Sequence, residues 1–481
     1  MPAARKTTRD IFLKEYAAAL AEDTAAMFVG AGVSIAAGYP SWKALLHDIG
    51  AELGVDSDDI SDLAALAQWH INGSSGATKI RQVIQDEIGV EHPVPSSMEV
   101  IARLPVRHIW TTNYDRLVER AFSSINRPLQ AISAAADLVL KPRAGSARLY
   151  KMHGSVDRLD DIVISTDDYE LFKSKRGAFL PLLQAHLSSL SFLFVGLSFT
   201  DPNVRHVLSL IRESFTEAPP EHFAIVRPPH RSDFKKKAQY EARKTQHDLW
   251  ASDLRRYGLR AVEIDSYDDV PELLRELEHK VARRRVWISG SWPIGPAGAS
   301  GADYVYQVAF GLGKELGHLG LTLVSGSGLL VGSASVSGFL SSLQQTGSWD
   351  LERRLIARPF PQPMAGKEPD RKQWKMLRSE LSRLSGITIF IGGQKVEDAK
   401  VVDADGVFAE FESATQSGSF LLPIGATGGT SRRIAERLLD PRNTPHVHQP
   451  TKNELRDLME PKSADALVKA AMAIVRRVAE G

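Results

Sequence analysis

The sequence predicts an α/β fold of two doubly wound domains, over residues 1–283 and 284–481. First, a chain of 481 residues is longer than one hydrophobic core ordinarily organises. Second, short apolar runs alternate with helical patterns, which is typical of parallel sheets covered by helices on both faces. Third, the first apolar run of each half ends in a glycine turn, so the same layout begins again near residue 285.

Composition excludes several classes of protein. The formal net charge of +1 gives no electrostatic reason to expect nucleic acid or an anionic membrane as a partner. The chain has no cysteine, which excludes disulfides, a thiol nucleophile and cysteine-ligated zinc, and we predict no metal. Residues 1–10 lack the apolar core of a signal peptide, and no run approaches the roughly 18 apolar residues of a membrane span. We therefore expect a cytoplasmic protein.

The first half begins with a helical pattern over residues 8–22 and a buried strand over 25–29. Gly30, Ala31 and Gly32 then end the strand. Glycine lets the backbone turn sharply and approach a phosphate, whose charge the amides of a following helix can receive. Taken alone, this turn fits a nucleotide site and an ordinary strand-to-helix connection equally well.

A helical insert follows, with patterns near residues 58–72, 76–88 and 96–103. Polar or glycine residues then end three successive strands: Asn113 and Asp115 after the strand from His108, His153 after the strand from Arg148, and Gly196 and Ser198 after the strand from Phe192. Individually, these residues suit turns, helix caps or a structural histidine. Ligands bind at the carboxyl ends of parallel strands, however, so their recurrence behind a glycine turn favours a ligand site.

The remaining elements continue the alternation. Strands are expected over 222–226 and 261–264, and the charged helical stretch 268–284 is interpreted as a connector. The second half is predicted to contain strands over 286–291, 321–325, 353–358, 387–391 and 420–423, and helices over 303–316, 370–384, 405–416, 431–439 and 464–478.

The ordered stretches Gly30-Ala31-Gly32-x-Ser34, Asn113-Tyr114-Asp115, His153-Gly154 and Gly196-Leu197-Ser198 resemble the signature of sirtuins, over about residues 10–265. The resemblance implies a Rossmann-like domain that binds NAD as substrate through Gly30, Ala31, Gly32, Ser34, Asp115, Gly196 and Ser198. It also implies that Asn113 and His153 are catalytic.

Two departures from sirtuins shape the expected chemistry. Thr112 stands where sirtuins usually have glutamine, and the zinc module with four cysteines is missing. The missing module counts against protein deacylation, whereas hydrolysis of NAD needs a positioned water and a stabilised ribose cation. Asn113 would orient that water or bind ribose hydroxyls, and His153 would bind the ribose or act as general base.

The second half resembles SLOG domains over about residues 285–450, through Ser289-Gly290-Ser291, Ser325-Gly326-Ser327-Gly328 and Ile391-Gly392-Gly393. A sirtuin-like domain followed by a SLOG domain resembles the effectors of Thoeris anti-phage defence. That resemblance implies a homo-oligomeric NAD glycohydrolase, activated by a cyclic ADP-ribose isomer that a partner TIR-domain protein makes. The implied activator site comprises Ser289, Gly290, Ser291, Gly326, Arg378, Lys395 and Glu410, with Glu412 as the alternative carboxylate.

The chemistry of this implied site is sensible, because Arg and Lys bind pyrophosphate and a carboxylate accepts ribose hydroxyls. Three other functions stay open: a sirtuin-type protein deacylase or ADP-ribosyl transferase, a non-enzymatic nucleotide sensor, and a catalytic second domain that uses the loop 425–430 and a glutamate. We favour the hydrolase with a sensor domain, because the first domain carries the more complete set of catalytic residues.

Overall fold

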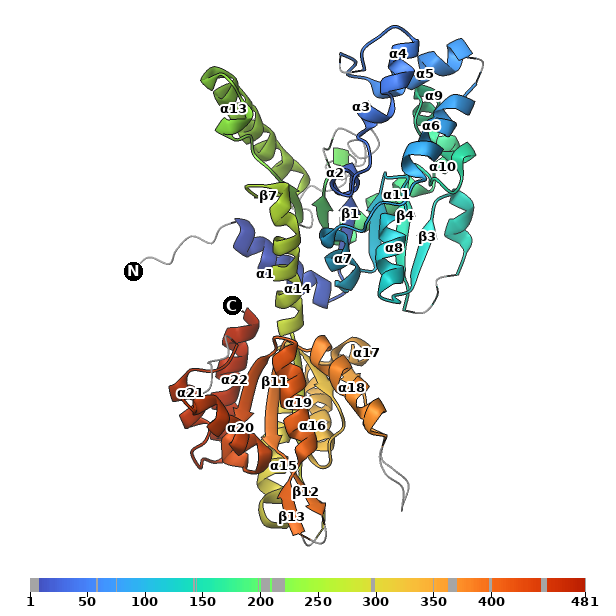
Figure 1. The fold of residues 1–481 in the computed structure, drawn as a ribbon. Helices are drawn as coiled ribbons and strands as arrows, with labels where there is room; N and C mark the ends of the chain where they lie inside the picture. Colours follow the sequence, from blue (N-terminus) through green and yellow to red (C-terminus); the bar gives the residue numbers. More distant parts are fainter. Residues whose placement is uncertain are drawn as a thin grey trace. The chain divides into compact units, whose positions relative to one another are not determined.

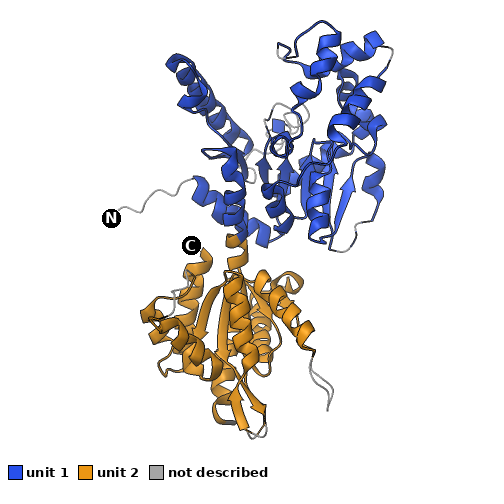
Figure 2. Ribbon diagram, in the orientation of Figure 1, with its two compact units in different colours: residues 1–278 blue, residues 279–481 orange. Residues whose placement is uncertain are grey.

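The computed structural model describes residues 8–57, 59–74, 76–141, 143, 145–197, 199, 208–209, 221–295, 299–348, 350–361, 370–397, 400–442 and 448–480. The chain divides into two compact units, residues 1–278 (unit 1) and 279–481 (unit 2), as Figure 2 shows. Each unit is built on its own parallel sheet.

Within the described residues of unit 1, the sheet has seven parallel strands in the order β3-β4-β2-β1-β5-β6-β7. The strands are β1 Ala25–Val29, β2 His108–Thr111, β3 Leu129–Ile132, β4 Ala147–Lys151, β5 Ser191–Val195, β6 His222–Val226 and β7 Leu259–Glu263. Val29 lies opposite Thr111 of β2 and Val195 of β5, so the central strands end at the same level. Polar residues that follow these strands therefore meet at one edge of the sheet.

Helices surround this sheet, as Figure 1 shows. They are α1 Thr8–Ala21, α2 Ala31–Ala36, α3 Trp42–Leu45, α4 His47–Glu52, α5 Leu63–Ser74, α6 Thr78–Ile88, α7 Ser96–Arg103, α8 Leu117–Ser124, α9 Thr166–Glu170, α10 Phe172–Arg176, α11 Phe179–Ser189, α13 Lys237–Leu254 and α14 Val270–Arg283. The predicted helical insert is α3 to α7, and its helix α5 packs against α9.

The core of unit 1 is rich in aromatic side chains that stack along the sheet. Trp110 of β2 stacks on Tyr150 of β4 with ring centroids 4.4 Å apart, and Phe28 of β1 stacks on Phe194 of β5 at 5.7 Å. All four rings are buried. Offset aromatic stacking of this kind adds to the free energy gained from burial alone, and it fixes the spacing of the strands that carry the polar ends.

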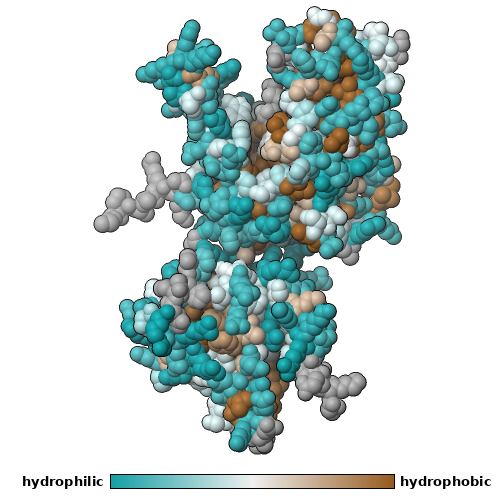
Figure 3. All heavy atoms as spheres, viewed as in Figure 1, coloured by the Kyte–Doolittle hydropathy of each residue, from teal (hydrophilic) through white to brown (hydrophobic). Residues whose placement is uncertain are grey.

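Two features of unit 1 differ from the sequence-based expectation. The edge strand β3 and the long helix α13 were not anticipated. In α13, which is described throughout, Leu254 is the only buried residue, so the helix has no apolar stripe that a pattern search could find; Figure 3 shows its polar surface. The stretch interpreted as a helical connector forms α14, and the boundary between the two units falls within this helix. Its Leu273, Leu274 and Leu277 are buried.

The described part of unit 2 contains a five-stranded parallel sheet in the order β10-β9-β8-β11-β14 and a hairpin, β12-β13. The strands are β8 Arg285–Ser291, β9 Thr322–Ser325, β10 Leu355–Ala357, β11 Ile387–Gly392, β12 Gln394–Glu397, β13 Lys400–Asp403 and β14 Phe420–Ile424. Its helices are α15 Ala299–His318, α16 Val331–Thr346, α17 Leu351–Arg354, α18 Arg371–Leu384, α19 Asp405–Gln416, α20 Gly429–Leu439, α21 Lys452–Asp457 and α22 Ala464–Glu480.

The two parallel sheets with their helices confirm the predicted α/β class and the two Rossmann-like domains. The predicted strands of unit 2 are present, and α19 has the predicted bounds. The hairpin β12-β13 was missed, because five of the eight residues in its strands have charged or amide side chains and no turn glycine joins the two short strands.

Candidate active site

A cavity of about 130 Å³ lies at the carboxyl ends of β1, β2 and β4 in unit 1. Aromatic side chains form part of its wall, among them Tyr39, Trp42 and Tyr169. Five residues predicted from the sequence also line it: Ala31, Ser34, Asn113, Asp115 and His153. Residues that are more than 120 positions apart in the chain therefore meet at one site.

A chain of hydrogen bonds connects the polar residues of this cavity. The Asn113 amide nitrogen donates to the carbonyl oxygen of Gly30 at 3.0 Å and to Ser34 Oγ at 2.8 Å. Ser34 Oγ in turn donates to Asp115 Oδ2 at 2.6 Å. Asp115 Oδ1 accepts from the Leu117 amide at 2.9 Å, at the start of α8. Asp115 therefore accepts from an amide in the first turn of α8, as expected of a capping residue, and it also lines the cavity.

The same network fixes how the Asn113 side chain is presented. Its nitrogen is committed to two acceptors, whereas its oxygen Oδ1 is buried and has no hydrogen-bond partner among the described residues. A buried polar atom without a partner costs free energy, which a bound ligand or water can recover. Asn113, a residue of the cavity wall, therefore keeps one acceptor that the described residues do not use.

The glycine turn brings the ends of β1 and β5 into close backbone contact. The amides of Gly30 and Gly32 donate to the carbonyl oxygens of Val195 and Gly196 at 2.8 and 2.9 Å. A Cβ atom on Gly30 would lie 2.4 Å from the Gly196 oxygen, and Gly196 itself has φ of +68°. Glycine is required here for close approach and for backbone conformation. Ser198, the other residue predicted on this side, lies outside the described residues.

His153 is buried, and aromatic rings confine it. Tyr169 lies edge-on to the imidazole with ring centroids 5.4 Å apart, and Phe172 does so at 6.2 Å. The His153 carbonyl oxygen accepts from the Val163 amide at 2.9 Å, and Gly154 turns the chain with φ of +90°. The bond to Val163 and the turn at Gly154 thereby fix the backbone at His153, whose side chain lines the cavity.

Two further residues contribute to this site and were not singled out from the sequence. Lys151, at the end of β4, is buried and donates from Nζ to the Asp115 carbonyl at 2.5 Å and to Glu119 Oε1 at 2.8 Å. It ties the loop that carries Asn113 to β4. The sequence gives no local signal for this role, because the same strand also carries Arg148. The second of these residues is Tyr39. Burial and the negative charge of Asp115 raise the pKa of its hydroxyl group.

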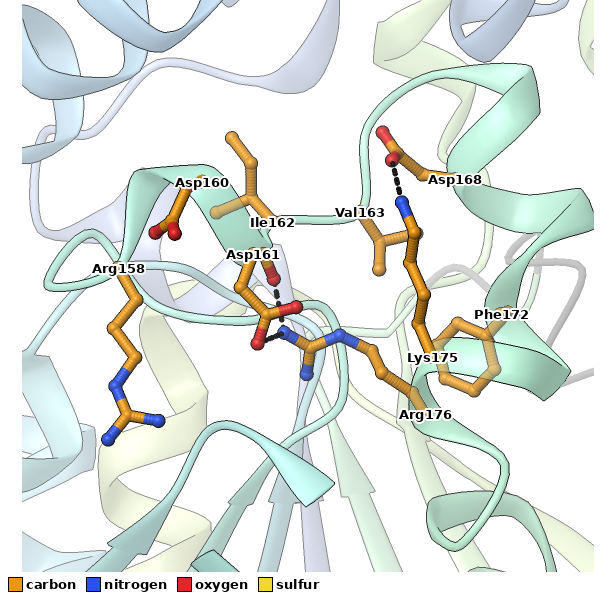
Figure 4. A pocket seen from close by; sticks show the side chains of 9 residues that line it. All are labelled: Arg158, Asp160, Asp161, Ile162, Val163, Asp168, Phe172, Lys175 and Arg176. Carbon is orange, nitrogen blue, oxygen red and sulfur yellow. Dashed lines mark hydrogen bonds and ion pairs between the residues drawn. The ribbon is translucent and has the colours of Figure 1, made fainter. Parts of the chain in front are cut away.

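A larger cavity of about 390 Å³ also lies in unit 1, and Figure 4 shows the side chains that line it. Val163 and Phe172, which both contact His153, form part of its wall. Four of its charged side chains form two ion pairs, Lys175 with Asp168 at 3.7 Å and Arg176 with Asp161 at 2.8 Å. None of the residues predicted from the sequence lines this cavity, so the smaller one is the candidate active site.

In unit 2, three of the predicted residues form a buried polar cluster. Glu410 Oε2 accepts from Ser289 Oγ at 2.6 Å, and Arg378 Nε lies 3.9 Å from Glu410 Oε1. Burial raises the pKa of Glu410 to about 7, although the Ser289 hydrogen bond and the Arg378 charge both act to lower it. Arg378 Nε is buried and has no hydrogen-bond partner among the described residues.

Two aromatic rings that the sequence analysis missed hold Arg378. Its guanidinium lies 5.5 Å from the Phe360 ring centroid and 5.7 Å from that of Trp374. Such cation–π contacts orient an arginine without using its donors. Trp374 precedes Arg378 by four residues on α18, so the pair lies on one helix face, and that spacing was visible in the sequence. Gly326 adjoins Phe360, since a Cβ there would lie 2.6 Å from the ring.

The other predicted residues of unit 2 lie around this cluster. A Cβ on Gly290 would lie 2.1 Å from the Ile391 oxygen, and Ser291 Oγ donates to the Gln394 oxygen at 3.0 Å. Lys395 is on the hairpin, where Nζ lies 2.7 Å from Asp405 Oδ1. Asp405 begins α19, the helix that carries Glu410, whereas the alternative carboxylate Glu412 is exposed on that helix.

The loop considered as a catalytic alternative uses its hydroxyl groups within the fold. Thr427 Oγ1 accepts from the Gly392 amide at 2.8 Å, and Thr430 Oγ1 donates to backbone oxygens that include Gly393 at 2.9 Å. Among the described residues, no group of three or more His, Cys, Asp or Glu side chains is placed to hold a metal ion. No helix in the described ranges has both the length and the apolar character needed to cross a membrane.

Comparison with known proteins agrees with the two-unit organisation. Residues 107–249 match the SIR2-like domain family, and residues 269–478 match the family described as Sir2- and TIR-associating SLOG. The chain is 34% identical over 426 residues to the NAD(+) hydrolase ThsA of Bacillus cereus (strain MSX-D12), covering 87% of each chain. It is 33% identical to the NAD(+) hydrolase ThsA of Cytobacillus dafuensis, covering 91% of this chain and 89% of that one.

A more distant relative shares only part of the chain. Defense-associated sirtuin 2 of Bacillus subtilis is 27% identical over 196 residues, which is 39% of this chain and 19% of the relative. The ThsA matches, in contrast, span both units at more than 30% identity. The chain, in which a match to the SIR2-like family is followed by a match to the SLOG family, therefore belongs to the family of the ThsA NAD(+) hydrolases.

Proposed function

We propose that this chain is an NAD glycohydrolase that cleaves NAD to ADP-ribose and nicotinamide. The observation that carries the proposal is the convergence of Ser34, Asn113, Asp115 and His153 on one cavity at the carboxyl ends of parallel strands. Relatives that span most of the chain are named NAD(+) hydrolases, which supports the same activity. We assign hydrolysis to residues 1–283 and sensing to residues 284–481.

The proposed reaction breaks the bond between C1′ of the ribose and the nicotinamide nitrogen. The bonding electrons pass to the positively charged ring, which leaves as neutral nicotinamide and needs no general acid. A water oxygen bonds to C1′ and gives up a proton, leaving ADP-ribose. This division of labour agrees with a cavity lined by one histidine and one carboxylate, both oxygens of which accept hydrogen bonds within the protein.

Asn113 and His153 take the central roles in this proposal. Because Nδ2 of Asn113 is already committed, its oxygen is the atom that accepts a hydrogen bond from the attacking water or from a ribose hydroxyl. His153 receives the proton of the water or binds the ribose, since imidazole titrates near neutral pH. Ser34 and Asp115 hold Asn113 in place through the hydrogen bonds described above.

We further propose that unit 2 binds a cyclic ADP-ribose isomer, made by a partner TIR-domain protein, and that binding activates unit 1 within a homo-oligomer. Depletion of cytoplasmic NAD would then serve Thoeris anti-phage defence. The buried cluster of Ser289, Arg378 and Glu410 supports this proposal, because it combines a cation for pyrophosphate with a carboxylate for ribose hydroxyls. Lys395, Gly290, Ser291 and Gly326 complete the proposed activator site.

The decisive experiment measures nicotinamide release from NAD by purified protein, with and without cyclic ADP-ribose isomers. We expect release to require an isomer and to vanish in Asn113→Ala and His153→Ala. Arg378→Ala should lose the response to the isomer. Asn72→Ala and Arg383→Ala are matched controls, because both side chains are exposed and lie on helices α5 and α18 away from the two sites.

The outcomes separate the competing functions. Full activity in Asn113→Ala and His153→Ala would contradict the catalytic assignment. Release of nicotinamide that depends on an acylated peptide, with loss of its acyl group, would establish the deacylase instead. NAD binding without release, with an isomer present, would establish a non-enzymatic sensor. Release that is independent of any isomer would support the hydrolase and remove the sensor from the proposal.

A further inference from the structure

We propose that Arg176 is a positioning residue that holds His153 in its working orientation; the proposal rests on the catalytic role proposed for His153. Arg176 ends α10 and is only 2% exposed, although it carries a permanent charge. Charged side chains are almost never fully buried unless they are paired. The structure shows which groups this buried arginine serves.

The guanidinium of Arg176 binds the backbone on both sides of the His153 turn. Nη1 donates to the carbonyl oxygen of Met152, the residue that precedes His153, at 3.2 Å. Nη2 donates to the carbonyl oxygen of Asp161 and forms an ion pair with Asp161 Oδ2 at 2.8 Å. Nη1 also donates to the Ser133 oxygen at 2.6 Å, beyond the end of β3. Four acceptors from three segments therefore converge on one planar group.

These contacts fix the position of the His153 backbone in two ways. Met152 is its direct neighbour, so the first route is the covalent chain. The second passes through Asp161, two residues before Val163, whose amide donates to the His153 oxygen. Gly154 completes the packing: a Cβ there would lie 3.1 Å from Arg176 Nη2 and 2.6 Å from the Asp161 oxygen. The turn that carries His153 is thus closed against the guanidinium.

Helix α10 also supplies the ring that flanks His153. Phe172 and Arg176 are four residues apart, which places both on one face of the helix. Phe172 contacts the imidazole ring, while Arg176 contacts the backbone beside it. Figure 4 shows both side chains on α10, with Arg176 directed at Asp161. One short helix therefore fixes both the ring and the chain that bears it.

The geometry requires arginine rather than any cation. A guanidinium has five donors in a fixed planar fork, whereas a lysine ammonium has three donors at one point. A lysine at position 176 cannot reach Met152, Ser133 and Asp161 in the directions that they require. Because displacements of about 1 Å at a catalytic group can cost about 100-fold in rate, loosening this turn affects turnover more than substrate binding.

The test compares Arg176→Lys, Arg176→Ala and Asp161→Asn with the matched control Lys175→Met. Lys175 is the adjacent residue on α10 and lines the same cavity, but its side chain is about half exposed and pairs with Asp168. We expect Arg176→Lys to lower kcat for NAD about 10- to 100-fold while KM changes less than about threefold. Asp161→Asn should cause a smaller loss, since the carbonyl acceptor remains, and Lys175→Met should behave as wild type.

Rescue of kcat by added guanidinium ions distinguishes a positioning role from a merely structural one. Added at a concentration that leaves the wild type folded, guanidinium should partly restore kcat to Arg176→Ala, whereas methylammonium and sodium should not. It should not restore His153→Ala. The pH profile of kcat, taken per folded molecule, should also change in Arg176→Lys. If Arg176→Ala does not fold, Arg176→Lys and Asp161→Asn still provide the kcat, KM and pH readouts.

The outcomes distinguish failure of this inference from failure of the proposed function. If His153→Ala retains activity, the catalytic assignment itself is wrong. If His153→Ala is inactive but Arg176→Lys keeps the wild-type kcat and pH profile, only the positioning role is overturned. A loss in Arg176→Lys that matches the loss of folded protein, with an unchanged pH profile and no guanidinium rescue of Arg176→Ala, would likewise overturn it.

Discussion

Replacement of Glu410 with glutamine is expected to stabilise unit 2 above neutral pH, even if it weakens binding of the proposed activator. Glutamine keeps an oxygen that can accept from Ser289 Oγ, but it removes the carboxyl group that burial disfavours when ionised. The structure therefore predicts a gain in stability that depends on pH. Sites built for ligands commonly carry this kind of cost.

The magnitude follows from the pKa of Glu410, which burial raises from its ordinary value of 4.5 to about 7. A folded-state pKa above the unfolded value means that folded unit 2 binds the proton more tightly. The free energy of unfolding of unit 2 is therefore highest below pH 4.5, where Glu410 is protonated, and it decreases as pH rises toward 7. Each pH unit in that interval contributes about 1.4 kcal/mol, so the penalty approaches about 3 kcal/mol at pH 8. Glu410→Gln removes it.

The assay is a urea titration read by hydrogen exchange and mass spectrometry on the full chain. Peptides from β8 and β11 report on unit 2, and peptides from β1 and β5 provide an internal reference in unit 1. With a slope near 2–3 kcal/mol per molar urea, the midpoint of unit 2 should rise by about 1 M at pH 8. At pH 5, where only a small part of the penalty has developed, it should rise by no more than about a third as much. A gain of equal size at both pH values, or a loss at pH 8, would refute the argument.

Three further predictions concern other parts of the structure. His222 is buried in β6, and burial lowers its pKa from 6.5 to about 4. The contribution of neutral His222 to the free energy of unfolding of unit 1 is therefore complete above pH 6.5 and is lost as pH falls toward 4. His222→Gln should flatten this pH dependence in acid unfolding of unit 1. Gly196→Ala should lower the melting temperature of unit 1 and abolish NAD cleavage. The control is Gly54→Ala, because Gly54 has a similar φ of +70° but open space around it. This control should lower the free energy of unfolding by only about 1 kcal/mol, the cost of backbone strain. Trp374→Ala should raise the isomer concentration for half-maximal activation about tenfold without changing the maximal rate. Met376→Ala, an exposed residue on the same helix, should leave that concentration unchanged.

Much of the candidate site could be predicted because parallel sheets place the residues after each strand at one edge. Ser34, Asn113, Asp115 and His153 each follow an apolar strand, so recognising the strands was enough to group them. In unit 2, the family resemblance supplied Ser289, Arg378 and Glu410, which form one cluster in the structure.

The supporting residues could not be predicted in this way, because their contacts depend on packing that no local pattern records. Lys151 and Arg176 resemble ordinary basic residues in the sequence, yet both are buried and donate to backbone oxygens around the cavity. Phe360 contacts Arg378 from outside α18, so no helical spacing connects the two residues. The edge strand β3 lacks a continuous apolar run, and only its last residue, Ile132, is buried.

The order of the strands has a consequence for the synthesis of the protein. Ser34 and Asn113 are 79 residues apart, and His153 comes a further 40 positions along the chain. β1 reaches its neighbour β5 only when residues 191–195 have been made. A polypeptide released early therefore lacks either the histidine or the strand that positions the glycine turn. Long-range sheet pairing of this kind forms late in folding, so fragments and half-made chains cannot assemble the cavity.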